Sequence, residues 1–406
     1  MTTRAGVDTG GTFTDVVTAE GDVFKVPSRA AAPAEAVGQA LGRAGGPGTL
    51  AHGTTVATNA LLERRGGRVA LITTRGQRDV IEIARQTRPS LYDIWADRTA
   101  PLVPRHLRFE VGGRLDSRGN EIEPLGSVPD LPGDLDAVAV CLLHSDLNPN
   151  HEVQVEKDLG GRVAVVRSSG VSPEYREYER LITTVIDAYL RRPCAGYLDA
   201  LAHLAPEVVV LTSAAGLVPL ADAATRPVSL LLSGPAGGVL AASAAAQQAG
   251  FGDCVTLDMG GTSTDVCLIV AGRPEPAAER VVAGLPVRMP ALDVFTIGAG
   301  GGSIARIDPG GALVVGPESA GADPGPCCYG RGGDQPTVTD ADLVAGRIPL
   351  EGLPGLGWLD LAAARAALAA TGVSAEAVIA VVDEAMTQAV RAVSAARGVD
   401  PAGLAL

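Results

Sequence analysis

Two aspartates, Asp8 and Asp258, stand at the same place in two copies of one short pattern, whose other residues suit the binding of a phosphate. Residues 6–17 read Gly-Val-Asp-Thr-Gly-Gly-Thr-Phe-Thr-Asp-Val-Val, and residues 256–267 read Thr-Leu-Asp-Met-Gly-Gly-Thr-Ser-Thr-Asp-Val-Cys. A Gly-Gly turn exposes consecutive backbone N–H groups without obstruction by Cβ, and threonine hydroxyls add donors beside it. The pattern therefore predicts phosphate-binding groups at Gly10, Gly11, Thr12, Thr14, Gly260, Gly261, Thr262 and Thr264.

The two aspartates need a separate explanation, because a carboxylate repels a phosphate unless a cation lies between them. We expect Asp8 and Asp258 to be catalytic and to hold Mg²⁺ or Mn²⁺, in part through its water molecules. Two such turns on opposite sides of a cleft would hold one polyphosphate, such as that of ATP. For a single copy, a turn that merely connects two strands is an equally good interpretation. Two copies with the same polar residues favour phosphate binding.

Two further segments are weaker candidates. Gly300, Gly301 and Gly302 form either a flexible turn or a third anion-binding loop, and the sequence does not distinguish these alternatives. His52 stands just before an expected helix start, where it is a candidate catalytic residue. A lone histidine in such a place is more often structural than catalytic.

The composition excludes several classes of protein. The 406 residues carry a net charge of −13 and are 46% hydrophobic, so we expect a folded protein of two or more domains without a nucleic-acid partner. No apolar run of about 20 residues indicates a membrane span, and we expect no membrane partner. The first residues lead directly into a strand, leaving no room for a signal peptide. We therefore expect a cytoplasmic protein with reduced cysteines.

Apolar runs alternate with segments of helical periodicity, which predicts an α/β protein. Short apolar runs at residues 69–74, 136–143 and 162–167 suit buried strands, and residues 109–123 suit an exposed hairpin. A long helical region is expected over residues 359–397.

The clearest helix is predicted over residues 172–190. Ser172 is its expected N-cap, and Pro193 is expected to stop it. Apolar residues recur along it at helical spacing, so we expect this helix to pack against a core.

The repeated hairpin indicates two lobes of one basic fold. We predict a two-lobed, actin-like ATPase fold, in which a ribonuclease-H-like unit is duplicated. A break at Gly250-Phe-Gly-Asp253 follows an Ala-rich helix and marks the boundary. The first lobe, with an inserted hairpin region, is expected at residues 1–250, and the second at residues 253–406.

Together these segments resemble the A-type subunit of the ATP-dependent hydantoinase/5-oxoprolinase family. The resemblance covers nearly the whole chain and rests on Gly6–Val17, Ala51–Leu62, Arg75–Asp79 with Arg88-Pro89, Ser172–Arg180, Ser233–Val239, Asp258–Val266, Ile297–Ile304, Gly316–Pro326 and Cys328–Gly333. The chain differs at Phe295, where the family commonly has His, at Ala214-Ala215, where Asn-Gly is usual, and at Gly170, where an acidic residue is frequent. Family A subunits also continue beyond the position of Leu406, so we expect a C-terminally truncated chain with an incomplete second lobe.

The resemblance implies ATP hydrolysis coupled to the opening of a small cyclic amide or imide, of the 5-oxoproline, hydantoin or N-methylhydantoin type. A lactam carbonyl is a poor electrophile, so phosphorylation of its oxygen would activate it. The resemblance also implies a B-type hydantoinase/oxoprolinase partner subunit. Two alternatives stay open: an ATP-using subunit of an acetone or ketone carboxylase, and a truncated, non-catalytic nucleotide-binding remnant.

Overall fold

The largest sheet of the molecule lies in the first half of the chain. The computed structural model describes residues 4–9, 13–27, 33–43, 45–352 and 357–406. The strands of this sheet are β1 (Arg4–Thr9), β2 (Phe13–Thr18), β3 (Val23–Pro27), β4 (Thr49–Thr54), β11 (Glu207–Leu211) and β12 (Leu217–Pro219). Their order is β12-β11-β4-β1-β2-β3, with β1 antiparallel to β2 and parallel to β4. Around it lie α1 (Pro33–Arg43), α2 (Val56–Leu62), α7 (Leu220–Thr225) and α8 (Ser233–Gln248).

The second copy of the repeated pattern forms the same kind of strand pair. It consists of β13 (Cys254–Met259) and β14 (Thr264–Val270), with β15 (Arg273–Pro274) and β20 (Val294–Ile297) alongside β14. Asp8 is paired with Asp15 between β1 and β2, and Asp258 is paired with Asp265 between β13 and β14. Both predicted strand pairs are therefore confirmed, and their registers are identical.

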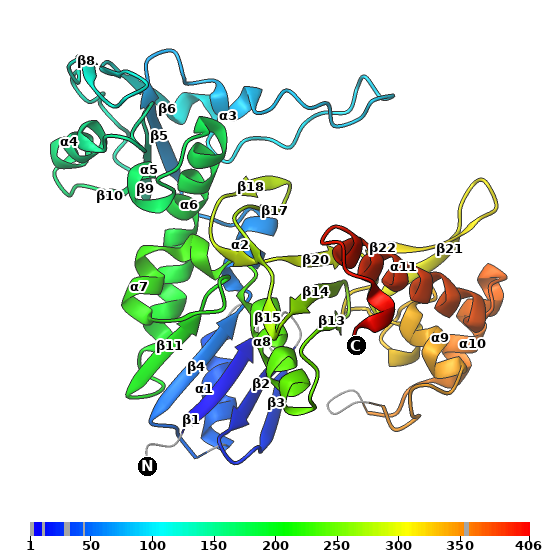
Figure 1. Cartoon of the computed structure of the whole chain (residues 1–406). Coiled ribbons are helices and arrows are strands. Elements are labelled where there is room, and N and C mark those ends of the chain that lie inside the picture. Colours follow the sequence, from blue (N-terminus) through cyan, green and yellow to red (C-terminus); the bar gives the residue numbers. More distant parts are fainter. Residues whose placement is uncertain (1–3, 10–12, 28–32, 44, 353–356) are drawn as a thin grey trace.

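A separate four-stranded sheet is inserted between β4 and β11 (Figure 1). Its strands, in the order β10-β9-β5-β6, are all parallel: β5 (Val69–Thr74), β6 (Arg108–Val111), β9 (Ala137–Cys141) and β10 (Ala164–Arg167). Every residue of β5 and β9 is buried, as expected for strands covered on both faces. The short helices α3 (Val80–Ile83) and α5 (Ser168–Val171), the helix α4 (Asn150–Leu159) and a 3₁₀ turn (Arg105–Leu107) accompany this sheet. The three predicted strands are confirmed, but only β5 and β9 are buried throughout, because β10 lies at the edge of the sheet with Val166 as its one buried residue.

The predicted hairpin over residues 109–123 is only partly correct. Its first residues belong to β6, which extends the parallel sheet, and only β7 (Arg114–Leu115) and β8 (Glu121–Glu123) form a hairpin. Gly113, with a φ of 115°, separates β6 from β7. β6 reads Arg-Phe-Glu-Val and lies at the edge of this sheet, with Arg108 and Val111 buried.

The central helix α6 (Glu177–Leu201) differs from its prediction at both ends. It begins after Arg176 and not at Ser172, and it continues through Pro193. A proline within a helix leaves the carbonyl four residues earlier without its donor. Here that carbonyl, of Tyr189, accepts a hydrogen bond of 2.8 Å from the N–H of Gly67. Burial of Tyr197, Leu198 and Leu201 beyond the proline keeps the helix intact.

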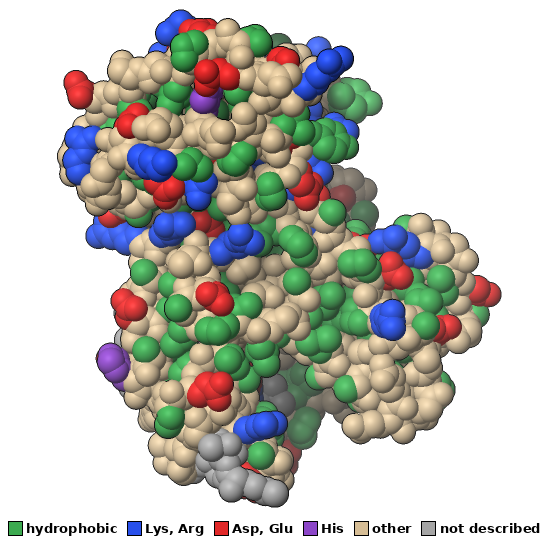
Figure 2. Space-filling model, turned by 60° about the vertical axis from the view of Figure 1, so that its left-hand side comes forward, with side chains coloured by type: hydrophobic (Ala, Val, Ile, Leu, Met, Phe, Trp, Pro, Cys, Tyr) green, Lys and Arg blue, Asp and Glu red, His purple; other side chains and the backbone are tan. Residues whose placement is uncertain are grey.

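The second half of the chain contributes one hairpin to the core of the first half. β17 (Arg280–Val282) and β18 (Leu285–Val287) bury Val282, Leu285 and Val287 in the same cluster as α6. The remaining elements are β16 (Pro276–Ala277), β19 (Ala291–Leu292), β21 (Ser303–Ile307), β22 (Leu313–Ser319), α9 (Val338–Val344), α10 (Leu361–Thr371) and α11 (Ala375–Ala395), with 3₁₀ turns at Pro227–Leu230, Cys327–Tyr329 and Pro401–Gly403. In Figure 2 the basic side chains on the visible face are mostly gathered over the upper part of the molecule, where Figure 1 shows the inserted sheet.

The predicted C-terminal helical region is present but broken. α10 ends before Gly372, which has a φ of 70°, and α11 follows at a bend of 82°. Among the described residues no single helix has the length and apolar character to cross a membrane, and only this bent pair meets both criteria together. After α11, Val255 N–H donates to the carbonyl of Ala405, so residue 405 lies parallel beside β13 as β4 lies beside β1.

Candidate functional site

The structure brings Asp8 and Asp258 into electrostatic range of each other. Each is the last residue but one of its strand, β1 or β13, and both are exposed. The pKa of Asp8 is raised above its ordinary value, first by desolvation and then by the negative charges of Asp15 and Asp258. Two carboxylates from distant parts of the sequence therefore lie at one site.

A glycine face of α8 lies along both carboxylates. A Cβ on Gly234 would lie 3.7 Å from Asp8 Oδ1, and a Cβ on Gly238, one turn later, would lie 3.6 Å from Asp258 Oδ2. Gly53 borders Asp8 from β4, where a Cβ would lie 3.1 Å from the same oxygen. Side chains at these positions would fill the space beside the carboxylates, so the glycines keep that space open.

This glycine face is not predicted from the sequence. Ser233–Val239 carried the family resemblance, but no role was predicted for it. The available signal was the spacing of Gly234 and Gly238, because residues four apart share one side of a helix. Ser233 anchors the start of α8, since its buried hydroxyl donates to the carbonyl of Thr54 at 3.0 Å.

The second aspartate of each pattern has a partner. Lys25 Nζ lies 2.6 Å from an oxygen of Asp15, and the hydroxyl of Thr296 donates to Asp265. Burial raises the pKa of Asp265, and the charge of Asp258 raises it further. Within the described residues, no hydrogen bond or ion pair is formed by the carboxylates of Asp8 and Asp258. These two are therefore the carboxylates available for a cation.

The second Gly-Gly turn has backbone donors to offer. Gly260 N–H donates to the carbonyl of Ser263 at 2.8 Å. The N–H groups of Gly261 and Thr262 have no acceptor in the described part of the chain. Thr264 is buried, and its hydroxyl donates to the carbonyl of Ala299 at 2.6 Å. The hydroxyl of Thr264 thus stabilises the turn in this structure.

In the first copy the turn itself cannot be compared. Gly10, Gly11 and Thr12 lie outside the described residues. Thr14 is fully buried and is paired with Thr9 at the ends of β1 and β2.

Gly300, Gly301 and Gly302 support the second turn from behind. Gly301 N–H donates to the carbonyl of Gly260 at 2.9 Å, and Gly302 N–H donates to that of Gly261 at 2.7 Å. Gly300 N–H donates to the hydroxyl of Ser303 at 2.9 Å. A Cβ on Gly300 would lie 2.7 Å from three backbone atoms of the turn. This segment is therefore neither a flexible turn nor a loop with N–H groups available to an anion.

The structure places His52 inside the protein and not at the surface of the site. His52 is only 1% exposed, and its Nε2 lies 2.6 Å from the hydroxyl of Tyr197. Burial lowers the pKa of His52 to about 3, so the ring is neutral at physiological pH. This environment is that of a core histidine that fixes α6 against β4.

The donor set of the site suits a hard cation that is shared with a ligand. The described residues contain no group of three or more His, Cys, Asp or Glu side chains that would hold a metal by themselves. Two free carboxylates, open space beside them and nearby backbone N–H groups match the way Mg²⁺ is bound in proteins, by one or two carboxylates, water and phosphate oxygens. The residues present therefore fit a magnesium-polyphosphate ligand.

Comparisons with known proteins identify the family to which the chain belongs. The family model for the hydantoinase/oxoprolinase N-terminal region matches residues 4–160 of this chain. The model for hydantoinase/oxoprolinase matches residues 180–406. Caprolactamase subunit alpha of Pseudomonas jessenii is 37% identical over 99% of this chain and 64% of its own length. 5-oxoprolinase 1 of Arabidopsis thaliana is 35% identical over 87% of this chain and 32% of its own length.

Solved structures show the same relationship. The crystal structure of the ATP-dependent caprolactamase from Pseudomonas jessenii superposes with a TM-score of 0.83 at 36% identity, covering 98% of this chain and 64% of that one. A nucleotide-free acetone carboxylase superposes with a TM-score of 0.78 at 26% identity, covering 99% of this chain and 64% of that one. The chain thus spans less than two thirds of the length of these relatives. Because these two family models together match most of its residues, the chain belongs to the hydantoinase/oxoprolinase family.

Proposed function

We propose that this chain binds magnesium-ATP between its two repeated hairpins and, as part of an enzyme, uses it to open a small cyclic amide or imide. One observation carries the proposal. Asp8 and Asp258, at the same register position of two hairpins, interact electrostatically beside the glycine face of α8. A cation and a polyphosphate would relieve the repulsion between these carboxylates.

Within this site, carboxylates would hold the metal ion and backbone N–H groups would hold the phosphates. Asp8 and Asp258 would hold the hydrated magnesium ion, while the N–H groups of Gly261 and Thr262 would donate to phosphate oxygens, as would the turn containing Gly10 and Gly11. Gly300–Gly302 would keep the second turn in shape. We assign His52 no proton transfer, because its neutral ring is buried. Bound ATP would supply the phosphoryl group that activates the carbonyl oxygen of the substrate.

We infer that the two hairpins belong to two lobes of an actin-like fold. The strand order β12-β11-β4-β1-β2-β3 and the repetition of its central hairpin support this inference. We propose that the two lobes comprise residues 1–250 and 253–406, and that the insertion in the first lobe is the parallel sheet β10-β9-β5-β6. The hairpin β17–β18 would then be a contact that the second lobe makes with the first.

The substrate and the partner are inferred from the relatives. Caprolactamase and 5-oxoprolinase act on cyclic amides by their names, so a lactam, 5-oxoproline or a hydantoin is the substrate class we propose. The caprolactamase relative is one subunit of a larger enzyme, and we propose a B-type subunit as the partner of this chain.

A ketone carboxylase is a second candidate, favoured by the structural likeness to acetone carboxylase. Bicarbonate-dependent and ketone-stimulated ATP turnover would support it over the amide hydrolase. A non-catalytic remnant is the third candidate. Phe295, which replaces the family's usual His, is half exposed on β20 and offers no ligand to a metal.

Calorimetric titration with magnesium-ATP tests the proposal directly. Asp8→Ala and Asp258→Ala should each abolish measurable binding, whereas the control Asp199→Ala, an exposed aspartate on α6, should bind like the parent chain. Binding that survives in both variants would refute the assignment of the site. With a B-type partner present, ATP hydrolysis should be stimulated by a lactam, 5-oxoproline or a hydantoin, and the absence of any stimulation would refute the proposed reaction.

A further inference from the structure

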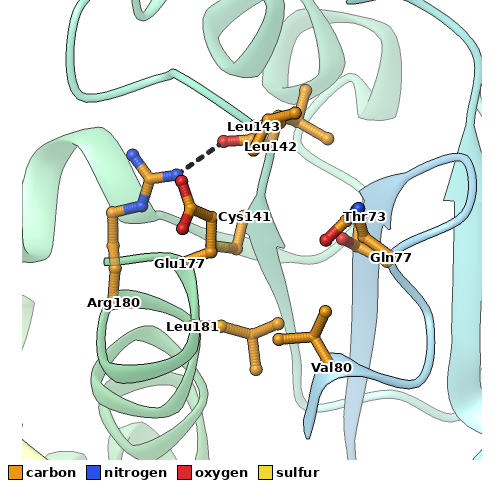
Figure 3. A pocket seen from close by; sticks show the side chains of 9 residues that line it. All are labelled: Thr73, Gln77, Val80, Cys141, Leu142, Leu143, Glu177, Arg180 and Leu181. Carbon is orange, nitrogen blue, oxygen red and sulfur yellow. Dashed lines mark hydrogen bonds between the residues drawn. The ribbon is translucent and has the colours of Figure 1, made fainter. Parts of the chain in front are cut away.

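A narrow recess lies in the inserted sheet, at the carboxyl ends of β5 and β9. Figure 3 shows its lining: Thr73, Gln77, Val80, Cys141, Leu142, Leu143, Glu177, Arg180 and Leu181. Gln77 comes from the Arg75–Asp79 segment and Glu177 from the Ser172–Arg180 segment. Both segments carried the family resemblance, yet neither takes part in the site at Asp8 and Asp258.

The topology of the sheet favours a ligand at this place. β5 is followed by β6 on one side, whereas the next strand, β9, lies on the other side of β5 and is followed by β10 farther out. The chain therefore turns in opposite directions after β5 and after β9. In parallel sheets, the crevice at the carboxyl ends of two such strands is where ligands bind.

The charged groups that line the recess are Arg180 and Glu177. Arg180 is fully buried and already compensated, since its Nη1 lies 2.7 Å from Asp146 Oδ1 and its Nη2 donates to the carbonyl of Leu142 at 2.9 Å. Glu177 has no hydrogen bond or ion pair among the described residues, although it lines the recess. Burial raises the pKa of the Cys141 thiol to about 11, so that group is neutral. The carboxylate of Glu177 lies in the field of Arg180 and Arg85, but its oxygens keep unused acceptor positions within the described part of the chain.

The size and polarity of the recess suit one ammonium group. Its cavity volume is about 10 Å³, which is room for one water-sized group. Glu177 stands on one side, and the hydroxyl of Thr73 and the side-chain amide of Gln77 stand on the other (Figure 3). A carboxylate, a hydroxyl and an amide oxygen can accept the three hydrogens of an ammonium group. Val80 and Leu181 offer an apolar wall for the carbon chain behind it.

A wider hollow adjoins the recess and is lined by both basic and acidic side chains. It has a volume of about 490 Å³ and shares Glu177 with the recess; its other lining residues include Arg85, Asp146, Tyr175 and Arg176. The guanidinium of Arg176 lies 5.5 Å from the ring centre of Tyr175 and has no ion pair among the described residues. A molecule with an ammonium group at one end and a carboxylate at the other would match both parts.

The recess is separate from the site at Asp8 and Asp258. α6 carries Arg180 near its start and Tyr197, which contacts His52, near its end. At 1.5 Å per residue the two are roughly 25 Å apart along the helix. A group bound in the recess is therefore too far from the aspartate pair to receive a phosphoryl group there.

We propose that the recess and the adjoining hollow bind an amino acid, with its ammonium group on Glu177, Thr73 and Gln77 and its carboxylate toward Arg176. Opening a cyclic amide with water gives one amine and one carboxylic acid on the same molecule, so the ligand is of the class that the reaction releases. This assignment of the ligand rests on the proposed function, and the recess itself does not.

The test is calorimetric titration of the full chain, without nucleotide, by four probes: ε-aminocaproate, caproate, caprolactam and ammonium chloride. We expect ε-aminocaproate to bind at least tenfold more tightly than caproate or caprolactam. Equal binding of caprolactam would overturn the proposal, because a neutral lactam lacks the ammonium group. Ammonium chloride that binds as tightly as ε-aminocaproate would overturn the amino-acid assignment in favour of free ammonium.

A pair of matched variants locates the binding. Glu177→Gln should weaken ε-aminocaproate binding more than tenfold, while Glu376→Gln, the same change in the first turn of α11, should leave it unaltered. Circular dichroism confirms that both variants fold. Full binding by the folded Glu177→Gln variant would refute the site. If ε-aminocaproate does not bind while magnesium-ATP binds normally, the recess proposal is refuted and the proposed function is not. If ε-aminocaproate binds while magnesium-ATP does not, only the proposed function is refuted.

Discussion

Asp8 and Asp258, from two different hairpins, each lie against a glycine of the same face of α8, and the charge of Asp258 helps to raise the pKa of Asp8. Gly234 faces Asp8 and Gly238 faces Asp258, one helical turn apart. One face of a single helix therefore borders both carboxylates. Any movement of α8 relative to β1 or β13 would change the space between them.

A methyl group on the glycine face of α8 should increase the stability of the fold and weaken the binding of magnesium-ATP. Gly238→Ala places a Cβ at ordinary contact distance from Asp258, so the chain should fold, and alanine in a helix stabilises it by up to about 1 kcal/mol. The methyl group also fills space needed by a hydrated cation, so magnesium-ATP binding should weaken about tenfold. Gly196→Ala, on an open side of α6, should give the stability gain alone. Unchanged binding by Gly238→Ala in calorimetry would contradict this role.

The stability of the ligand-free chain should depend on pH through Asp8. The pKa of Asp8 in the folded state is raised above the unfolded value of 3.8. The free energy of unfolding therefore decreases as the pH rises from 3.8 through this raised pKa, because Asp8 must then ionise in the folded protein. Asp8→Asn should therefore melt at a higher temperature than the parent chain at pH 7 without magnesium, and show no advantage below pH 3.8. Thermal melts over this pH range check it, and a lower melting temperature of Asp8→Asn at pH 7 would contradict the raised pKa that desolvation and the neighbouring carboxylates give Asp8.

Ala215 should be stabilised by replacement with glycine. Its φ of 63° lies in the left-handed region, where an alanine costs about 1 kcal/mol relative to glycine. Ala215→Gly should raise the free energy of unfolding in denaturant titrations by about that amount. The control Ala366→Gly, within α10, should lower it by a similar amount. A loss of stability in both variants would show that the methyl group of Ala215 matters more than its backbone conformation.

Gly66 should tolerate no side chain. A Cβ there would lie 2.1 Å from the ring of Tyr189, so Gly66→Ala must displace the ring that packs beside the interrupted turn of α6. Displacement of this kind lowers the free energy of unfolding by about 2–3 kcal/mol. Gly133→Ala, with open space around it, should be neutral in the same denaturant titration. Equal stability of the two variants would mean that the ring moves freely.

Much of the site could be predicted because its residues are local in sequence. Asp8 and Asp258 stand in two copies of one hairpin pattern, and the period of a strand fixes which residues are paired. The buried strands β5 and β9 were equally predictable, since strands covered on both faces are continuous apolar runs.

Features that depend on tertiary contacts could not be predicted in this way. Pro193 is a strong local signal for a helix end, but Gly67 supplies a hydrogen bond to the carbonyl that the proline leaves free. The glycine face of α8 becomes meaningful only when β1 and β13 are placed against it. Similarly, the residue types of Gly300–Gly302 and His52 suggest direct roles, whereas their hydrogen bonds join the glycines to the second turn and His52 to Tyr197 in the core.

The central claim is that Asp8 and Asp258 act on one magnesium-ATP, and a double-variant cycle tests it most directly. Calorimetry would measure magnesium-ATP binding by the parent chain, Asp8→Asn, Asp258→Asn and the variant with both changes. Each single change should weaken binding more than tenfold, and the double change should weaken it little further, because one ion is held by both carboxylates. Parent-like binding by either single variant, or losses that simply add, would show that the two aspartates do not share a ligand.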